Sequence, residues 1–286
     1  MAAVRVAFQG ERGAYSEMAA LQYFPPGATL VPKKSFADAF SAVKEKKAGF
    51  AVVPVENSIE GSVGEVYDLL ADTRLAAVGE VYQRVRHCLI ANRGVRMNDI
   101  KVAYSHPQAL GQCRAYLQKK KLDGMPAYDT AGSVKLVKEQ QLRDGAAIAS
   151  RRAAELYGME ILDEGIEDRK NNYTRFLVMS PPSAAATTAT KKVHKNDDSY
   201  YKTSIIFSVK HVPGALFGTL GEFAIGRLNL TKIESRPTKE TPWEYNFYVD
   251  FEGRAADLAV KKALAAIKGR TSYLKVLGSY KKAEYG

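Results

Sequence analysis

A threonine and an arginine stand side by side at the start of an apolar segment. The segment reads Asn171-Asn172-Tyr173-Thr174-Arg175-Phe176 and continues into Leu177-Val178-Met179. A hydroxyl can donate a hydrogen bond to a departing oxygen, and a guanidinium can bind a carboxylate through a forked pair of hydrogen bonds. Further along, Glu234-Ser235-Arg236-Pro237 ends a second predicted strand. The order of the two motifs predicts a catalytic module followed by a sensor module, and hence a regulated enzyme.

Four polar segments follow predicted strands and open predicted helices. In α/β folds the ligand lies beyond the carboxyl ends of the strands, and the free backbone N–H groups of a helix N-terminus favour anions. Taken singly, Ser16, Ser105 and Thr130 also read as ordinary helix N-caps. The segments are Gly10–Ser16, Pro54–Ser62, Ser105–Leu110 and Asp129–Ser133.

Strand and helix signals alternate through the first 180 residues. Val4–Phe8 reads as the first strand, and Phe50–Val55 is a continuous apolar run typical of a strand buried on both faces. Between them, Ser35 and Asp38 form a capping box that begins a helix stopping at Gly49. This alternation predicts an α/β domain with mostly parallel strands. The other expected elements are strands at Lys101–Tyr104, Ala146–Ala149 and Phe176–Met179, and helices at Pro107–Lys119 and Ala131–Gln140.

The composition changes after residue 180. Residues 181–202 contain Pro, Ala and Thr and then a run of charged residues without periodicity, which predicts a linker that includes His194. Residues 203–286 predict a compact unit in the order βαββαβ, the ferredoxin-like arrangement. Its strands are expected at Thr203–Lys210, Leu230–Arg236, Tyr245–Phe251 and Tyr273–Tyr280, and its helices at Gly214–Gly226 and Arg254–Ile267.

Composition argues against several classes of protein. No apolar run of the 286 residues approaches the roughly 20 that a membrane helix needs, and the N-terminus reads as a strand rather than a signal peptide. Two cysteines, Cys88 and Cys113, make no disulfide framework, which predicts a cytoplasmic protein. The net charge of +11 comes from lysines scattered over helix ends and loops, which favours solvated helix faces over nucleic-acid binding.

Neither a metal nor a nucleotide cofactor is expected. The four histidines lack the spacing of metal ligands, and no nucleotide-binding loop is present. His87, beside Cys88, reads as a packing residue of a strand. A cofactor-free enzyme or a binding protein therefore remains.

A set of motifs in order makes the chain resemble the prephenate dehydratases, with the plant-type arogenate dehydratases as close relatives. The resemblance covers nearly the whole chain except the linker. It implies two periplasmic-binding-protein-like (type II) lobes with the active site between them, followed by a regulatory ACT domain. The expected catalytic domain is 1–180, with lobes of roughly 1–77 plus 168–180 and 78–167. The motifs are Pro54–Ser62, Ser105–Leu110, Asp129–Ala131, Asn172–Phe176, Gly214–Phe217, Asn229–Pro237 and Leu277–Tyr280.

The resemblance implies the decarboxylating dehydration of prephenate to phenylpyruvate in L-phenylalanine biosynthesis. Aromatisation of the ring drives this reaction, so no metal, nicotinamide or covalent intermediate is required. Thr174 is expected to stabilise the departing hydroxide, and Glu56 is the alternative acid if burial raises its affinity for the proton. Arg175 is expected to bind a carboxylate unless an internal salt bridge occupies it.

The remaining expected site residues follow from the same resemblance. Asn57, Ser58, Ser105 and Thr130 are assigned to substrate binding, and Phe176 is expected to fix the Thr174–Arg175 pair by packing. L-Phenylalanine is the expected effector, and the chain is expected to form a homodimer or homotetramer. Effector-binding residues are expected at Gly214, Ala215, Leu216, Asn229, Leu230, Glu234, Ser235 and Arg236.

Three other functions remain open from the sequence. The same chemistry on arogenate, which carries an amine in place of the ketone, would form L-phenylalanine directly. A non-catalytic amino-acid sensor has no need for the Thr174-Arg175-Phe176 motif. A nucleic-acid binder rests on the net charge alone, and it would show salt-sensitive binding.

Overall fold

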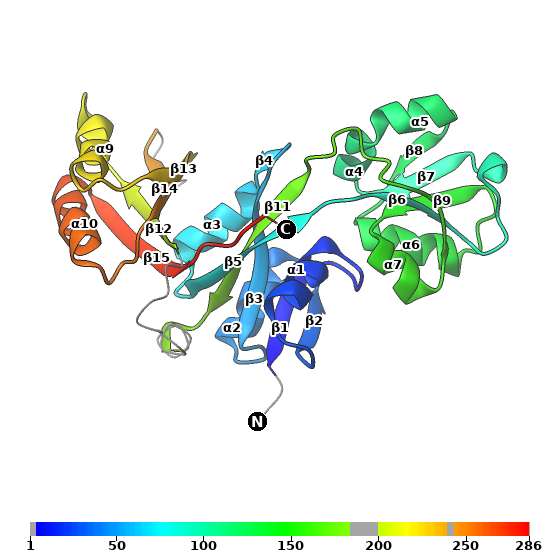
Figure 1. Cartoon of the computed structure of the whole chain (residues 1–286), viewed down its shortest axis with the longest axis horizontal. Coiled ribbons are helices and arrows are strands. Elements are labelled where there is room, and N and C mark those ends of the chain that lie inside the picture. The colour runs from blue at the N-terminus through cyan, green and yellow to red at the C-terminus, as the bar shows by residue number, and fades with distance from the viewer. Residues whose placement is uncertain (1–3, 184–199, 239–242, 286) are drawn as a thin grey trace. The chain divides into compact units, whose positions relative to one another are not determined.

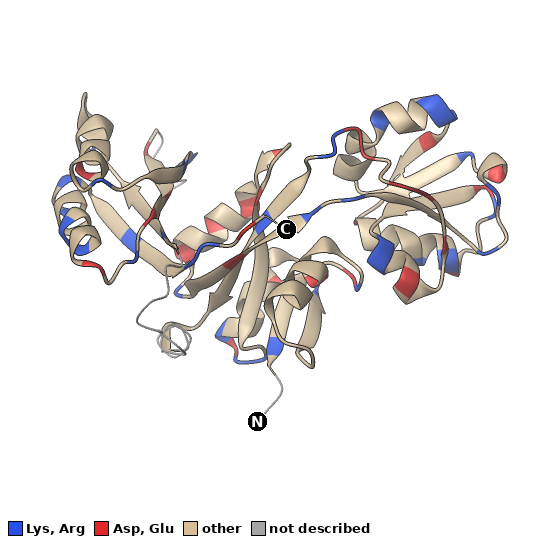
Figure 2. Cartoon of the chain, viewed as in Figure 1, with Lys and Arg blue, Asp and Glu red and all other residues tan. Residues whose placement is uncertain are grey.

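The computed structural model describes residues 4–183, 200–238 and 243–285, and its strands form three sheets (Figure 1). The chain divides into two compact units, one of residues 1–66, 81–176 and 285–286 and one of residues 67–80 and 177–284. The chain passes between the units within α3 (Gly64–Asp72), β5 (Ala76–Arg84) and β11 (Tyr173–Ser180). Lysines and arginines lie on helices and loops of each unit, with acidic residues among them (Figure 2). Within the described part of the chain, no helix is both long enough and apolar enough to span a membrane.

The first sheet has β3 (Phe50–Asn57) at its centre. Its order is β2 (Thr29–Lys33), β1 (Arg5–Gln9), β3, β11 and β5, and β4 (Gly61–Ser62) pairs with β3. β1 is parallel to both β2 and β3, as the apolar run of β3 predicts. The helices of this part are α1 (Tyr15–Tyr23) and α2 (Phe36–Lys44).

The start of α2 confirms the predicted cap, but its end differs from the prediction. Ser35 Oγ accepts a hydrogen bond from Asp38 N at 3.1 Å. The helix ends at Lys44, before the expected Gly49, and Lys46 then adopts a left-handed backbone with φ of 59°. β5 runs from Ala76 to Arg84 and so crosses residue 77, the expected end of the first lobe.

The second sheet has the order β10 (Glu160–Glu164), β6 (Cys88–Ala91), β9 (Gly145–Ala149), β7 (Val102–Ser105) and β8 (Asp123–Pro126). β7 is parallel to β8 and β9, whereas β6 is antiparallel to β9 and β10. The helix expected over 107–119 is broken at Cys113, whose backbone has φ of −113° and ψ of 20°. The helices are η1 (Met97–Asp99), α4 (Pro107–Gln112), α5 (Arg114–Lys120), α6 (Thr130–Glu139) and α7 (Arg151–Tyr157).

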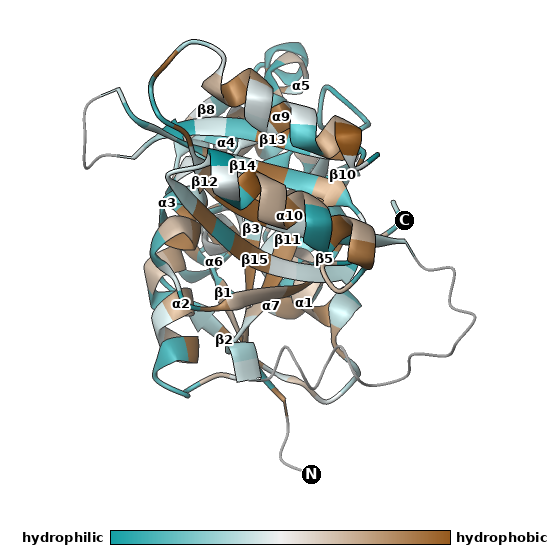
Figure 3. Cartoon of the chain, turned by 90° about the vertical axis from the view of Figure 1, so that its left-hand side faces the viewer, coloured by the Kyte–Doolittle hydropathy of each residue, from teal (hydrophilic) through white to brown (hydrophobic). Residues whose placement is uncertain are grey.

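The third sheet is antiparallel and has the order β13-β14-β12-β15. Its elements follow the predicted βαββαβ order: β12 (Tyr201–Ser208), α9 (Ala215–Ile225), β13 (Leu230–Pro237), β14 (Tyr245–Glu252), α10 (Leu258–Arg270) and β15 (Tyr273–Lys281). β12 begins inside the segment expected as a linker, and residues 184–199 of that segment lie outside the described residues. Apolar side chains between the sheet and its helices form the core, and apolar segments of α9 and α10 appear brown in Figure 3.

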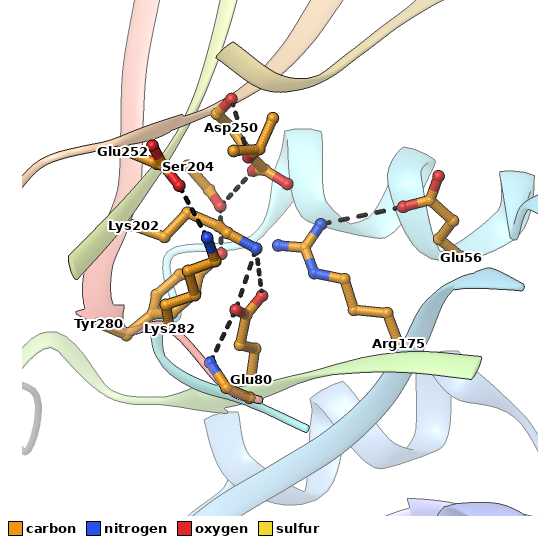
Figure 4. A network of polar contacts seen from close by, with 11 residues as sticks. Glu56, Glu80, Arg175, Lys202, Ser204, Asp250, Glu252, Tyr280 and Lys282 are labelled. Carbon is orange, nitrogen blue, oxygen red and sulfur yellow. Dashed lines mark hydrogen bonds and ion pairs between the residues drawn. The ribbon is translucent and has the colours of Figure 1, made fainter. Parts of the chain in front are cut away.

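A buried ion pair joins β5 to the third sheet within the second unit (Figure 4). Lys202 Nζ lies 3.0 Å from each carboxylate oxygen of Glu80, and Ala283 N donates to the same carboxylate at 3.0 Å. Lys202 is 3% exposed and Glu80 is also 3% exposed, so water contributes little to the solvation of either charge. Each charge therefore depends on the other.

The same sheet holds the second half of α3. Tyr248 Oη donates to the carbonyl of Tyr67 at 2.9 Å, and Arg236 Nε pairs with Asp68 Oδ1 at 3.2 Å. Lys275 Nζ donates to the carbonyls of Leu70 at 3.0 Å and Ala71 at 2.8 Å. A lysine at this place satisfies carbonyls that a helix leaves unpaired at its C-terminus. α3 is thus anchored to β13, β14 and β15.

We predict that Lys202→Met destabilises the protein by about 3–5 kcal/mol, because it leaves the Glu80 carboxylate buried without its cation. Urea unfolding followed by circular dichroism measures the change. The double variant Lys202→Met with Glu80→Leu is expected to recover most of the loss, since no charge then remains buried. A single variant as stable as the wild type would contradict this account.

Candidate active site

A cavity of about 440 Å³ lies within the first unit. Its walls come from the carboxyl ends of β1 and β3, from the first residues of β11, from the segments after β7 and β8, and from the starts of helices. The contributions of β1 and β3 and of the segments after β7 and β8 agree with the general position of ligands in α/β folds. The lining residues are Gln9, Gly10, Ala14, Tyr15, Ser16, Phe36, Pro54, Asn57, Val63, Glu65, Val85, His106, Gln108, Ala109, Gln112, Tyr128, Asp129, Thr130, Thr174 and Phe176.

Asn57 fixes the direction in which the Thr174 hydroxyl points. The Asn57 Oδ1 accepts from the backbone N–H groups of Ile59 and Glu60, both at 3.0 Å. A backbone N–H only donates, so the amide nitrogen must face the other way. That nitrogen donates to Thr174 Oγ1 at 3.0 Å and to Asn172 Oδ1 at 2.8 Å. Since Thr174 Oγ1 accepts this bond, its own proton remains to be donated into the cavity.

A chain of hydrogen bonds continues from Asn57 across the first unit. Asn172 Nδ2 donates to Gln112 Oε1 at 2.9 Å, and His87 Nε2 lies 3.0 Å from the same oxygen. Gln112 Nε2 donates to Glu60 Oε1 at 3.4 Å, which fixes the orientation of the Gln112 amide. The chain of hydrogen bonds therefore connects the hydroxyl of Thr174 to α4 and to the residue before β6.

His87 has a defined tautomer in this chain. Burial lowers the pKa of His87, so its ring is neutral and carries a single N–H. That N–H lies on Nε2, since Gln112 presents an acceptor to it. Tyr15 Oη donates to the Arg86 carbonyl at 2.7 Å and lies 3.2 Å from Nδ1, the ring nitrogen without a proton. Burial also raises the pKa of Tyr15 well above its ordinary value, which keeps it a phenol.

Strand alternation separates the two side chains that stand together in the sequence. Successive residues of a strand point to opposite faces, so Thr174 and Phe176 line the cavity while Arg175 does not. Arg175 is 4% exposed, and its guanidinium lies 4.0 Å from Glu56 Oε2. Glu56, the alternative acid, is likewise absent from the cavity wall, whereas its neighbour Asn57 is present. Arg175 thus makes an ion pair with Glu56, the alternative that the sequence left open, and its contact with a substrate carboxylate stays a prediction.

The other predicted substrate-binding residues divide into two groups. Thr130 lines the cavity at the first position of α6. Ser105 does not, because its fully buried hydroxyl donates to the Ile148 carbonyl at 2.6 Å. Ser58 Oγ donates to the Asn171 carbonyl at 3.0 Å and accepts from Tyr173 N at 2.9 Å. Ser58 and Ser105 thus hold the strands that carry the cavity wall.

The first turn of α1 borders the cavity. Its N-cap is Ala14, which makes no side-chain cap, and the next two residues, Tyr15 and Ser16, line the cavity. Uncapped N–H groups of a helix favour anions. Gly13 allows the preceding loop to approach α7, since a Cβ there would lie 2.7 Å from Ala153 Cα and φ is +91°.

A second cavity, of about 350 Å³, lies in the second unit. Among the residues expected to bind an effector, Ala215 and Leu216 line it, and Gly214 precedes them as the N-cap of α9 with φ of 80°. Asn229 instead donates to Glu252 Oε2 at 3.1 Å, and Arg236 pairs with Asp68. Leu230, Glu234 and Ser235 lie on β13 and are not among the lining residues. Those are Val209, Lys210, His211, Val212, Pro213, Ala215, Leu216, Trp243, Glu244, Tyr245 and Phe247.

Gln112 and His87 are the site residues that sequence reasoning missed. Gln112 was seen only as part of a helix, and His87 was interpreted as packing, although both belong to the hydrogen-bonded chain that ends at Thr174. The polar side chains Tyr15, His106 and Gln108 also line the cavity. Each of the three lies in a strand-exit loop or at the start of a helix, and this position is the sequence feature that could have predicted them as site residues. Among the described residues, no group of three or more His, Cys, Asp or Glu side chains is placed to bind a metal ion.

Comparisons with known proteins identify the family of the chain. The sequence model of the family described as prephenate dehydratase matches residues 6–184. Arogenate dehydratase 2 of Petunia hybrida is 43% identical over 97% of this chain and 71% of its own length. Arogenate dehydratase/prephenate dehydratase 2, chloroplastic, of Arabidopsis thaliana is 43% identical over 97% of this chain and 72% of its own length. The chain belongs to the prephenate dehydratase family.

Two solved structures share the fold over nearly the whole chain. Prephenate dehydratase from Arthrobacter aurescens, in complex with L-Phe, has a TM-score of 0.85 and 31% identity, and covers 98% of this chain and 90% of its own. GqqA, described as a novel type of quorum quenching acylase, has a TM-score of 0.85 and 33% identity, and covers 98% of both chains.

The relatives also correct the predicted location. Cysteine content favoured the cytoplasm, but several of these similar proteins, including two from Arabidopsis thaliana, carry the description chloroplastic. The prediction is wrong because the absence of a disulfide framework does not distinguish one reducing compartment from another.

Thr174→Val is expected to lower kcat about 100-fold or more with little change in KM, because it removes one hydrogen-bond donor while keeping the shape of the side chain. Steady-state formation of product measures both constants. Thr174→Ser retains the hydroxyl and is expected to retain most of the activity. Equal activity of the Val and Ser variants would exclude the hydroxyl from the reaction.

Asn57→Asp tests the orientation of that hydroxyl. A carboxylate in this place only accepts, so Thr174 would donate its proton to residue 57 and no longer into the cavity. We expect kcat to fall about 100-fold, close to the loss from Thr174→Val, and the double variant to be little worse than either single one. Thermal melts check that each variant remains folded. Additive losses in the double variant would contradict the shared role.

Proposed function

We propose that this chain catalyses the decarboxylating dehydration of prephenate or arogenate under the control of L-phenylalanine. The observation that carries the proposal is the Thr174 hydroxyl, which accepts from Asn57 and is left with a proton to donate into the cavity. Prephenate would give phenylpyruvate, and arogenate would give L-phenylalanine, with water and carbon dioxide in each case. The arogenate and prephenate dehydratase names of its relatives support the same reaction.

The reaction requires stabilisation of a departing hydroxide. The bond between the ring and its carboxylate breaks, its electron pair enters the ring, and the ring hydroxyl leaves to complete the aromatic system. A threonine is a very weak acid, so Thr174 acts as a hydrogen-bond donor to the leaving oxygen, with water supplying the proton. Its preset orientation means that little reorganisation accompanies the reaction.

The cavity provides for the rest of the substrate. Tyr15 and Ser16, at the uncapped start of α1, and Thr130 at the start of α6 would bind a carboxylate through N–H and hydroxyl groups. Phe36, Pro54 and Phe176 supply apolar surface to the same cavity. A carboxylate held against apolar surface is poorly hydrated, which favours its loss as carbon dioxide.

L-Phenylalanine is proposed to bind in the cavity of the second unit, which would act as an ACT domain. Backbone N–H groups at the start of α9 suit its carboxylate, and Tyr245, Phe247 and Leu216 suit its ring. The Arthrobacter aurescens relative is described in complex with L-Phe. Helix α3 would connect the sites, because its first turn carries Glu65 to the catalytic cavity while its later residues bind β13, β14 and β15.

Assembly and location complete the proposal. Phe217 and Ile225 of α9 are 82% and 78% exposed and Leu258 of α10 is 70% exposed, which supports association through this face into a homodimer or homotetramer. The chloroplastic relatives support a plastid as the compartment. The sensor alternative is disfavoured because binding alone requires no hydroxyl with a preset direction.

The test is turnover by the purified protein of prephenate and, separately, of arogenate, with and without L-phenylalanine. Formation of phenylpyruvate or L-phenylalanine, changed by the effector, is the expected result. Folded protein that binds L-phenylalanine but converts neither substrate would favour the sensor. Binding of unrelated nucleic acids that weakens steeply with salt would favour a nucleic-acid-binding protein.

We predict that Asp68→Ala weakens the control of activity by L-phenylalanine while leaving its binding intact. The variant removes the ion pair between α3 and β13, so the conformations that the effector distinguishes become less coupled to the catalytic cavity. Calorimetry is expected to give a Kd within about threefold of the wild type, with the effect on activity at least halved. Glu222→Ala, which breaks an ion pair of 2.5 Å between α9 and α10, serves as the control. Full effector control in Asp68→Ala would contradict the role of α3.

A further inference from the structure

The charges on the catalytic cavity wall have an unexpected sign for an enzyme that binds two carboxylates. Among the described residues that line the cavity, none is lysine or arginine. Two are carboxylates, Glu65 in the first turn of α3 and Asp129 at the start of α6. A dianionic substrate would meet repulsion from both.

The helix cap alone does not require the negative charge of Asp129. Asp129 caps α6 by accepting from Gly132 N, and its second oxygen accepts from Glu11 N at 3.3 Å. Asparagine caps helices about as well as aspartate, so the cap on Gly132 would survive without the charge, and only the contact with Glu11 N needs the second oxygen. Asp129 is nevertheless an acid, and it is only 9% exposed on the wall of a cavity.

A second carboxylate lies near Asp129. Tyr128 donates to Glu11 Oε1 at 3.2 Å, which places a further carboxylate beside Asp129. Burial, with Asp129 and Glu11 nearby, raises the pKa of Tyr128, so this phenol remains neutral. No lysine or arginine pairs with Asp129 or Glu65 among the ion pairs of the described residues. This part of the wall therefore favours a cation.

The two substrates of the proposed reaction differ in the charge of one group, and a negatively charged wall would bind the two forms of that group differently. Both carry two carboxylates and the ring hydroxyl, but arogenate has an ammonium where prephenate has a ketone. Prephenate has a net charge of −2 and arogenate of −1. A ketone only accepts hydrogen bonds and is poorly matched to a carboxylate, whereas an ammonium donates three.

We propose that Asp129, assisted by Glu65, binds the ammonium group of arogenate and makes this chain prefer arogenate over prephenate. The inference rests on the proposed dehydratase function and specifies its substrate. Asp129 is a specificity-determining residue: attraction of the ammonium favours one substrate, and repulsion and an unpaired carboxylate disfavour the other. The adjacent first turn of α6 suits the neighbouring carboxylate of the same amino-acid group.

The experiment compares kcat/KM for arogenate and prephenate in the wild type, Asp129→Asn, Glu65→Gln and Asp99→Asn. Asp129→Asn keeps the cap on Gly132 N and the shape of the side chain, removes the charge, and loses the acceptor for Glu11 N. Asp99→Asn removes the same charge from an exposed capping carboxylate that accepts from Arg96 N at 2.9 Å and lies off the cavity wall, so it is the matched control. Thermal melts verify that each variant folds.

We expect the wild type to prefer arogenate by at least about tenfold, and Asp129→Asn to lower kcat/KM for arogenate about 10- to 100-fold. Its kcat/KM for prephenate is expected to stay within about threefold or to rise, and Glu65→Gln to change the ratio in the same direction by less. Asp99→Asn is expected to leave the ratio unchanged.

Three results would overturn the inference. A wild type that prefers prephenate would overturn the inference but leave the proposed dehydratase function intact. Equal losses for both substrates in Asp129→Asn would assign the residue a structural role only. Turnover of neither substrate by the folded wild type would remove the proposed function itself, and the inference with it.

Discussion

The amide of Asn57 is the interaction on which the catalytic cavity depends. Two backbone N–H groups determine which of its ends is oxygen, and the nitrogen then determines where the Thr174 proton points. Asn57 also donates to Asn172, from which the chain of hydrogen bonds runs to Gln112 and His87. The amide of Asn57 is 6% exposed. Through it, the backbone of the turn after β3 determines the orientation of a hydroxyl on β11. A hydroxyl held in one direction before substrate arrives requires little rearrangement during the reaction.

Much of the fold could be predicted from local sequence, and the site only in part. The cap at Ser35, the apolar strand at Phe50 and the βαββαβ order all follow from neighbouring residues, and the structure has each of them. Thr174 and Asn57 were found through motifs, but strand alternation already implied that Arg175 faces away from Thr174. Gln112 and His87 were missed because they meet Thr174 only through contacts between residues distant in the chain. Local pattern carries no information on such contacts.

The electrostatics of the protein differ between its surface and its cavity. The chain has a net charge of +11, and its basic residues lie on helices and loops of both units (Figure 2). Such a field attracts anions over distances of about a Debye length, roughly 8–10 Å in physiological salt. No described lysine or arginine lines the cavity. Anionic groups of a ligand would instead be bound there by backbone N–H groups and hydroxyls. Attraction to the protein and recognition by the cavity thus depend on different groups, so surface charge can change without altering which ligand fits.

The division of the chain into units has a consequence for how such proteins can be recombined. Residues 67–80 belong to the catalytic half of the sequence but pack with residues 177–284, where Glu80 meets Lys202 and Tyr67 meets Tyr248. A chimera that joined this catalytic half to a foreign C-terminal domain at residue 181 or 203 would inherit a helix end and a buried carboxylate without their partners. Exchange of the C-terminal domain therefore requires matching changes in α3 and β5. The boundary between the two units is defined by a set of contacts, and it does not coincide with any single position in the sequence.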